Sequence, residues 1–186
     1  MSPYGWARAL LLMTRVTRWQ VTIALVAPFL SLGIAAQGAP QPTTSVTVAG
    51  NVAQSLSLSV VDFKRYPTHQ VDYVPRNTVE EKGTAPARHY TGCLLRDVLA
   101  AAKPVESKPR ELRKSYVVAT ASDGYEVVFS WAELFVSPMG DSVLVVYERD
   151  GAPLPDDEGP IALIVVADMR PVRHVKWLRS LTLRSA

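Results

Sequence analysis

The sequence contains a single cysteine, Cys93, and only three histidines. One cysteine excludes an internal disulfide, so packing alone must hold the fold together. The histidines, at positions 69, 89 and 174, show neither the i, i+4 spacing nor the cysteine neighbours that a zinc site would use. A phosphate-binding loop, a dinucleotide fingerprint and a Gly-x-Ser-x-Gly elbow are also missing. The sequence therefore predicts neither catalytic residues nor metal ligands of these common types.

The sequence also lacks an apolar run long enough to cross a membrane. Residues 21–36 are apolar, but Pro28 interrupts them, and they fall short of the roughly 20 residues that a spanning helix needs. Three arginines precede this run and the small residues "AAQGA" follow it, a pattern typical of a secretory leader. An uncleaved anchor is the alternative. We expect a signal peptide at 1–38, a spacer at 39–44 and a single domain at 45–186.

The leader has no Arg-Arg pair, the nearest arrangement being "RVTR". A twin-arginine signal would export a folded protein already loaded with its cofactor, so its absence favours Sec-type export of an unfolded chain. We expect a periplasmic or secreted product that keeps no stable membrane insertion after cleavage. Such a product would not carry a cofactor inserted in the cytoplasm.

The chain has an excess of positive charge only because of the leader. The chain has 20 Lys and Arg against 17 Asp and Glu, a formal net charge of +3. The three excess positive charges are the leader arginines Arg8, Arg15 and Arg18, and the rest of the chain is formally neutral. Nucleic acid is therefore not expected as a partner.

The remaining chain is rich in strand patterns. Two alternating runs meet at Gly50-Asn51, and two further runs turn at Asp123-Gly124 and Asp150-Gly151, so three hairpins or strand pairs are predicted. "IALIVVAD" is typical of a buried strand. Helical spacing predicts a helix over "YTGCLLRDVLAAAKP", with Thr91 or Gly92 at its start, and a helical turn over "SWAELFV". The fold class that follows is α+β, with mixed β-sheets and few short helices.

Three features bear on function, and the last two have alternative interpretations. Residues 64–89 form the longest stretch without a regular pattern, and such loops are often functional. The acidic run Asp156, Asp157 and Glu158 is better explained as a solvated loop than as a metal site. Cys93 would be reactive at the first turn of a helix, but its apolar neighbours favour a core position.

The order of the motifs resembles a known family. "YTGCLLRDVLAAA", "ASDGYEVVFSWAEL", "DGAPLPDDEGPIALIV" and "RHVKWLRSL" are similar, in sequence and spacing, to the molybdopterin-binding domain of sulfite-oxidase-type enzymes. The resemblance covers roughly residues 45–184 and is most specific at Val175 to Leu178. It implies the sulfite-oxidase-like fold, with a pterin in a cleft and basic residues near the carboxyl end.

One departure from the family decides the predicted function. The enzymes hold molybdenum through a cysteine thiolate ahead of the helix motif, but the corresponding stretch "RNTVEEKGTAPARHY" has no cysteine. Cys93 stands where the family carries an apolar residue. The chain looks like the small stand-alone periplasmic members of this fold, some of which bind reduced pterins and signal through a membrane-bound partner that makes or degrades cyclic di-GMP.

The resemblance leaves two main functions open. The first is an exported, non-catalytic pterin-binding protein with that kind of membrane partner. The second is an oxidoreductase domain or subunit that uses a molybdenum cofactor through a non-cysteine or solvent ligand. An interaction domain whose cleft is filled by side chains is a third and simpler interpretation.

The residues that we expect around a pterin supply a carboxylate for its amino and N–H edge, aromatic faces for its rings and cations for its polar tail. Each has an alternative, because Asp-Gly is a good turn, aromatic residues often pack in the core and His89 borders a loop. Strand alternation would place the side chains of His174 and Lys176 on one face, with Arg170 outside the run. Trp177 is a further candidate for the aromatic face that stacks on the pterin. Arg88 and Tyr90, next to His89 in the sequence, could line the cleft with it. The candidate site residues are Asp123, Tyr125, Trp131, Arg170, Arg173, His174, Lys176 and His89.

Overall fold

The computed structural model describes residues 44–74, 86–106, 108 and 110–185. The expected signal peptide and most of the spacer lie outside these residues, so both stay predictions. Within the described ranges, no helix is long and apolar enough to cross a membrane. Residues 37–186 form one structural unit, which holds every element described below.

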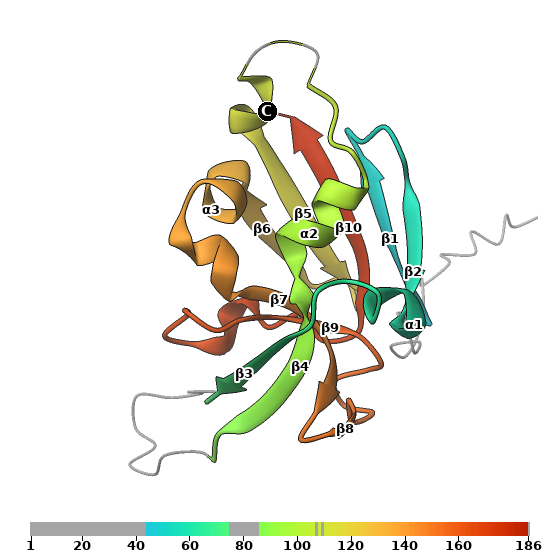
Figure 1. Cartoon of the computed structure of the whole chain (residues 1–186), viewed down its shortest axis with the longest axis vertical. Coiled ribbons are helices and arrows are strands. Elements are labelled where there is room, and N and C mark those ends of the chain that lie inside the picture. Colours follow the sequence, from blue (N-terminus) through green and yellow to red (C-terminus); the bar gives the residue numbers. More distant parts are fainter. Residues whose placement is uncertain (1–43, 75–85, 107, 109, 186) are drawn as a thin grey trace, which may run out of the picture. The chain divides into compact units, whose positions relative to one another are not determined.

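The first of two sheets joins both ends of the described chain. Its five strands lie in the order β2-β1-β10-β5-β6, and the early strand β1 pairs parallel with the final strand β10. The other pairs are antiparallel. This sheet forms the upper part of Figure 1. The strands are β1 (Ser45–Gly50), β2 (Leu56–Ser59), β5 (Ser115–Ala121), β6 (Glu126–Ser130) and β10 (Leu178–Ser185).

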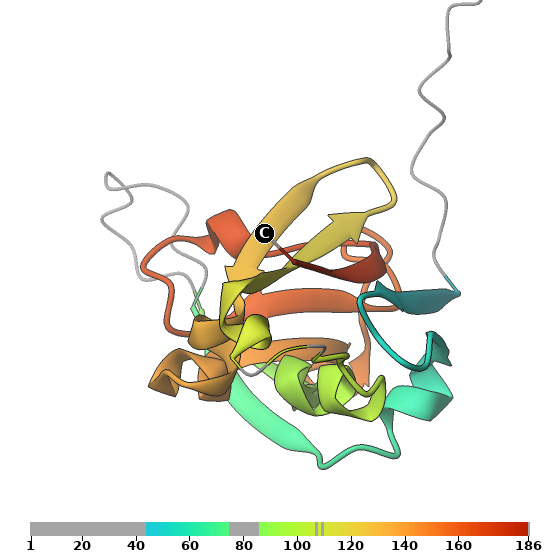
Figure 2. The same ribbon diagram turned by 90° about the horizontal axis from the view of Figure 1, so that it is seen from above.

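The second sheet is antiparallel and is built around strand β7. Its strands lie in the order β3-β4-β7-β8, and β9 pairs with β7 as well. In Figure 2, the orange strands β7 and β9 lie between the yellow β5–β6 hairpin and the green strand β3. The strands are β3 (His69–Tyr73), β4 (Arg88–Leu94), β7 (Val143–Arg149), β8 (Ala152–Pro153) and β9 (Ala162–Val165).

The helices are short and stand between strands. Helix α3 follows β6 because Ser130 and Glu133 form a capping box: the Ser130 hydroxyl accepts from the Glu133 amide at 3.2 Å, and the Glu133 carboxylate accepts from the Ser130 amide at 2.7 Å. This confirms the helical turn predicted for "SWAELFV". The α-helices are α1 (Val60–Phe63), α2 (Leu95–Ala101) and α3 (Trp131–Phe135), and the 3₁₀ turns are η1 (Glu111–Lys114), η2 (Pro138–Ser142) and η3 (Pro171–Arg173).

Two hydrophobic clusters use opposite faces of the second sheet. On β7, Val143 and Val145 belong to the larger cluster, which also contains residues of the first sheet and of α2 and α3. The alternating neighbours Leu144 and Val146 belong to a smaller cluster with Tyr73. Side chains of adjacent strand residues point to opposite faces, so buried runs such as β7 and β9 serve both clusters.

The three turn predictions are confirmed. The β1–β2 pair turns after Gly50, the β5–β6 hairpin turns at Asp123-Gly124, and the β7–β8 hairpin turns at Asp150-Gly151. In the last turn Asp150 has φ 55° and Gly151 has φ 78°, the left-handed values that tight hairpins need. The α+β class of mixed sheets with few short helices is confirmed as well.

The predicted start of the main helix is wrong. The helix begins at Leu95, and the preceding residues from Tyr90 to Leu94 are strand β4, paired with β7. Pairing with a central strand overrides the local helical spacing, because it satisfies backbone groups on a buried segment. Gly92 fits this position since a Cβ there would lie 2.2 Å from the Val145 carbonyl oxygen.

Two other expectations need correction. The stretch 64–89 is not wholly irregular, because it contains strand β3, which pairs with β4; residues 75–85 lie outside the described ranges. Residues 174–177 are not part of the last strand, which begins at Leu178. Only Val175 bridges to a strand, through paired backbone bonds of 2.8 and 2.9 Å with Leu163.

Candidate pterin site

The segment from His174 to Trp177 is locked against the loop that precedes β9. The Trp177 amide donates to the Glu158 carbonyl at 2.8 Å, and the indole N–H donates to the Asp156 carbonyl at 3.0 Å. Trp177 has φ 48°, an unusual value for a bulky residue. Gly159 must be glycine here, because it has φ 78° and a Cβ would lie 2.4 Å from Trp177 Cδ1.

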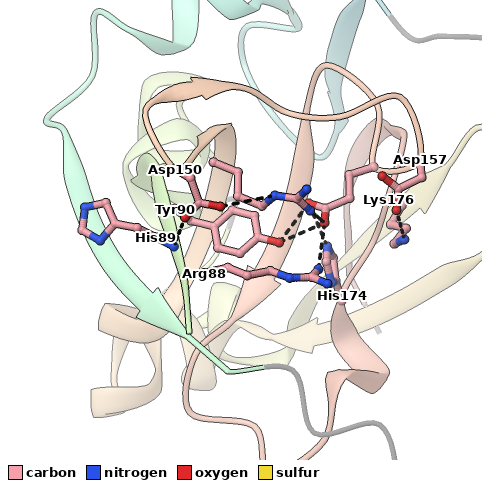
Figure 3. Close-up of polar contacts among 9 residues, drawn as sticks. Arg88, His89, Tyr90, Asp150, Asp157, His174 and Lys176 are labelled. Carbon is pink, nitrogen blue, oxygen red and sulfur yellow. Dashed lines mark hydrogen bonds and ion pairs between the residues drawn. The ribbon is translucent and has the colours of Figure 1, made fainter. Parts of the chain in front are cut away.

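A fully buried carboxylate, that of Glu158, stands at the centre of this contact. The Tyr90 hydroxyl lies 3.0 Å from both carboxylate oxygens, and an Arg149 guanidinium nitrogen lies 2.6 Å from Oε1 (Figure 3). Arg88 adds a third contact at 3.3 Å. A buried charge is tolerated only when it is paired and hydrogen-bonded, and these three groups from β4 and β7 meet that requirement. We call Glu158, Tyr90, Arg149 and Arg88 the Glu158 cluster.

His174 packs beside this cluster with its ring buried. Its Nε2 lies 3.9 Å from Glu158 Oε2, too far for a hydrogen bond, and the ring meets Tyr73 and Tyr90 edge-on. Burial lowers the pKa of His174, although the Glu158 charge acts in the opposite direction. The imidazole is therefore neutral near pH 7.

Among the described residues, two buried side-chain polar atoms have no hydrogen-bond partner: His174 Nε2 and Ser122 Oγ. Both adjoin the segment 174–177, since the Ser122 amide donates to the Trp177 carbonyl at 3.0 Å. An unsatisfied buried polar group costs about 1–3 kcal/mol, and natural proteins keep few of them. The segment is therefore the place where, among the described residues, buried polar groups are left without partners.

Lys176 and His174 both lie close to the acidic loop, although the strand on which their common face was predicted does not include them. Lys176 Nζ lies 3.1 Å from a carboxylate oxygen of Asp157. His89 is less central: in Figure 3 its ring lies on the far side of Tyr90 from His174, and it pairs with Asp72 at 2.9 Å, in an exposed position. Of the predicted residues, His174 and Lys176 come together, and His89 stands apart.

Asp123 and Tyr125 lie in the exposed β5–β6 turn. The Asp123 carboxylate accepts from the Tyr125 amide at 2.9 Å, which stabilises the turn itself. The Tyr125 hydroxyl donates to the Val172 carbonyl and so joins the hairpin to the η3 turn. Neither contact involves the Glu158 cluster, and a pterin-binding role for both residues stays a prediction.

The remaining predicted residues have other contacts. Arg173 forms two bonds with Asp168, one of them at 2.8 Å, and lies 3.4 Å from a Glu133 oxygen. Trp131 stacks on Phe135 with ring centroids 3.9 Å apart, and Arg170 is exposed. Arg173 therefore ties the loop after β9 to helix α3, and Trp131 packs at the edge of the core.

The interpretation of the acidic run is wrong for one of its three residues. Asp156 and Asp157 are exposed, as a solvated loop requires, but Glu158 is completely buried. The charged partner Arg149 was not recognised from sequence either. One available signal was the alternation in β4, which puts Arg88 and Tyr90 on the same face and so predicts a polar pair there.

The single thiol is not available as a metal ligand. Cys93 lies in β4 with no exposed surface, inside the larger hydrophobic cluster. Burial, with a smaller contribution from Asp97, raises its pKa to about 12. A thiolate is the form that binds metals, so Cys93 does not fit the role of a molybdenum ligand. Within the described ranges, no group of three or more His, Cys, Asp or Glu is placed to hold a metal ion.

This arrangement of two sheets and short helices is a molybdopterin-binding fold of the sulfite oxidase type. The family model described as "Oxidoreductase molybdopterin binding domain" matches residues 36–186, and the chain belongs to that family. Mitochondrial sulfite oxidases of Rattus norvegicus and Mus musculus are each 29% identical over 150 residues, which covers 71% of this chain and 27% of the relative. The chain thus spans about a quarter of the length of these curated relatives.

A solved structure shows the same fold. The sulfane dehydrogenase SoxCD from Paracoccus pantotrophus superposes with a TM-score of 0.60 at 20% sequence identity, over 76% of this chain and 38% of that chain. At this identity the likeness extends to the fold alone. The sulfite-oxidase-like fold expected from the motifs is confirmed.

Proposed function

We propose that this chain is an exported, non-catalytic protein that binds a reduced pterin and acts as the ligand-sensing partner of a membrane signalling protein. The proposal rests on the burial of the single thiol and on its raised pKa. Cys93 is buried and its pKa is raised to about 12, so the chain offers no thiolate to molybdenum. A family member without that ligand retains the pterin-sized fold but lacks the usual attachment for the metal.

The polar groups around the segment 174–177 support a pterin as the ligand. A pterin carries ring nitrogens, an N–H, an amino group and a carbonyl, which together can satisfy an imidazole nitrogen and a hydroxyl. His174 Nε2 and Ser122 Oγ are such groups, and both lack partners. The Lys176 ammonium adds a cation for a polar substituent, and Asp123 stays our candidate for the amino and N–H edge.

The second candidate is a molybdenum-cofactor-dependent oxidoreductase domain or subunit. The family membership and the similarity to mitochondrial sulfite oxidases favour it. Its metal would need a ligand other than the Cys93 thiolate. Molybdenum bound in stoichiometric amount would support this candidate over a pterin-only protein.

The proposal is tested by titrating the purified full chain with a tetrahydropterin under anaerobic conditions in a calorimeter. We expect saturable binding, about three- to tenfold weaker in His174→Phe because one hydrogen bond to the ligand is lost while the ring volume is kept. Asp123→Asn should also weaken binding, whereas the control Glu126→Gln in the same hairpin should not. A wild-type protein that binds no pterin contradicts the proposal.

The partner that we propose is a membrane-bound enzyme that makes or degrades cyclic di-GMP. Deleting the gene should change cellular cyclic di-GMP, and the wild-type chain should restore it. A His174→Phe variant that folds but binds pterin poorly should fail to restore it. Equal restoration by both proteins would separate signalling from pterin binding and contradict the sensing role.

A further inference from the structure

A cavity of about 640 Å³ lies among helix α1, strand β7, the loop from Pro153 to Pro160 and Trp177. The groups that hold the Glu158 carboxylate belong to Tyr90, Arg149 and Arg88, and none of them is among its lining residues. The volume falls within the range of about 300–1,000 Å³ that is common for small-ligand sites. The cavity is therefore large enough for a ligand and distinct from the Glu158 cluster.

The residues that line the cavity favour a positively charged ligand. Tyr147 and Trp177 contribute aromatic side chains, and Val60 contributes an apolar one. The ionisable residues are Glu148, Asp156 and Lys64, two anions against one cation, which leaves one net negative charge. Aromatic rings attract cations through the negative face of the ring, so rings and carboxylates act in the same direction.

The protein already places a cation in this wall. Lys64 Nζ lies 2.6 Å from Glu148 Oε1 and 5.6 Å from the ring centroid of Tyr147. The hydrogen bond to Glu148 raises the pKa of Lys64, so the ammonium form is favoured there. The Lys64 side chain is 49% exposed, and a long, exposed lysine can move its head group into water at little cost. Lys64 thus marks a cation position that a ligand can take over.

Trp177 forms another part of the cavity wall and is held firmly in place. Its backbone has left-handed geometry, yet its amide, its carbonyl and its indole N–H are each hydrogen-bonded. A strained residue held by several bonds is typical of a position fixed for function. Because the indole N–H is bonded to Asp156, the ring cannot rotate freely out of the cavity wall.

We propose that this cavity is a second binding site, for a small organic cation with an apolar or aromatic body. The ligand's ammonium or amidinium group pairs with Glu148 between the carboxylate and the Tyr147 ring, and displaces the Lys64 head group toward water. Its body packs against Val60 and Trp177. This site shares Trp177 with the segment proposed to bind the pterin, but its cation position at Glu148 does not depend on pterin binding.

The test compares three probes that share one body: 2-phenylethylammonium, 2-phenylethanol and 3-phenylpropionate. Each is titrated into the full chain by calorimetry, and NMR follows the signals of Lys64 and the Trp177 indole. We expect the cation to bind at least about tenfold more tightly than the alcohol or the anion. A cation that shows no binding at millimolar concentration, or an anion that binds equally well, overturns the proposal.

Two variants distinguish a ligand-binding position from an ion pair that only stabilises the fold. Lys64→Met removes the resident cation and should tighten binding of the probe by about three- to tenfold, whereas Glu148→Gln should weaken it by about tenfold. Equal affinities in both variants and the wild type contradict the proposed position. Pterin affinity should be unchanged in Glu148→Gln; its loss would show that the two sites are one and would overturn the separation.

Discussion

Two glutamates of the described chain, Glu158 and Glu148, form ion pairs in neighbouring places, and the two differ in burial. Glu158 has no exposed side-chain surface and is held by two arginines and a tyrosine, whereas Glu148 is 28% exposed and pairs, among the described residues, with Lys64 only. In the first case water cannot replace a lost partner, and in the second it can. The Glu158 cluster therefore stabilises the fold, whereas the Lys64–Glu148 pair can open for a ligand.

Removing the buried carboxylate is the strongest test of this difference between the two glutamates. Glu158→Ala leaves the buried Tyr90 hydroxyl and the partly exposed Arg149 guanidinium without their shared partner, and we expect a loss of about 3 kcal/mol in the free energy of unfolding. Glu158→Gln should lose less, because the amide still bonds Tyr90. Denaturant unfolding monitored by circular dichroism measures both. A Glu158→Ala protein with wild-type stability would show that the cluster does not support the fold.

The contact between the Glu158 loop and Trp177 is tested at Gly159. Gly159→Ala places a Cβ 2.4 Å from Trp177 Cδ1 at a left-handed φ, so we expect a loss of about 2–3 kcal/mol. Gly151→Ala is the matched control, because its φ is also 78° but no atom lies within 4 Å of the new Cβ. Only the backbone strain, about 1 kcal/mol, should remain there. Equal losses in the two variants would mean that Trp177 gives way easily.

The burial of His174 predicts a pH dependence. Its pKa is lowered in the folded protein, so the unfolded chain binds more protons as the pH falls below the ordinary value of about 6.5. Stability contributed by the neutral ring is thus present above pH 6.5 and is lost on acidification, by at most about 1.4 kcal/mol per pH unit. Unfolding midpoints between pH 5 and pH 8 measure this slope. His174→Phe should flatten it, and an unchanged slope would assign it to other groups.

The smallest stability effect is expected at the exposed pair. Glu148→Gln should leave the unfolding midpoint close to that of the wild type, since water replaces the lost contact with the half-exposed Lys64. Thermal unfolding of the two proteins side by side checks this. A loss comparable to that of Glu158→Gln would remove the distinction between the two pairs.

Much of the fold was predictable because its signals are local. The Asp-Gly turns need left-handed backbone, and "SWAELFV" carries a complete capping box, so both specify their own structure. The start of α2 was not predictable in this way. Its preceding residues have helical spacing, but pairing with β7, distant in sequence, makes them a strand.

The site was less predictable for the same reason. Glu158 reads as one of three loop acids, and only the approach of Arg149 and Tyr90 from two different strands makes it a buried charge. Cys93 shows the reverse case, because its apolar neighbours were enough to predict a core position, and it is fully buried. Residues whose surroundings come from nearby sequence were recognised, and residues whose partners come from other strands were not.

The central claim is that the fold retains a pterin without a thiolate-bound metal. The most direct measurement takes the full chain, produced with its own N-terminal segment in a molybdenum-replete bacterium, and determines bound pterin by fluorescence after oxidation together with molybdenum by elemental analysis. We predict a bound pterin with molybdenum far below one atom per chain. One molybdenum per chain, or a protein that neither carries nor takes up a reduced pterin, would contradict the account.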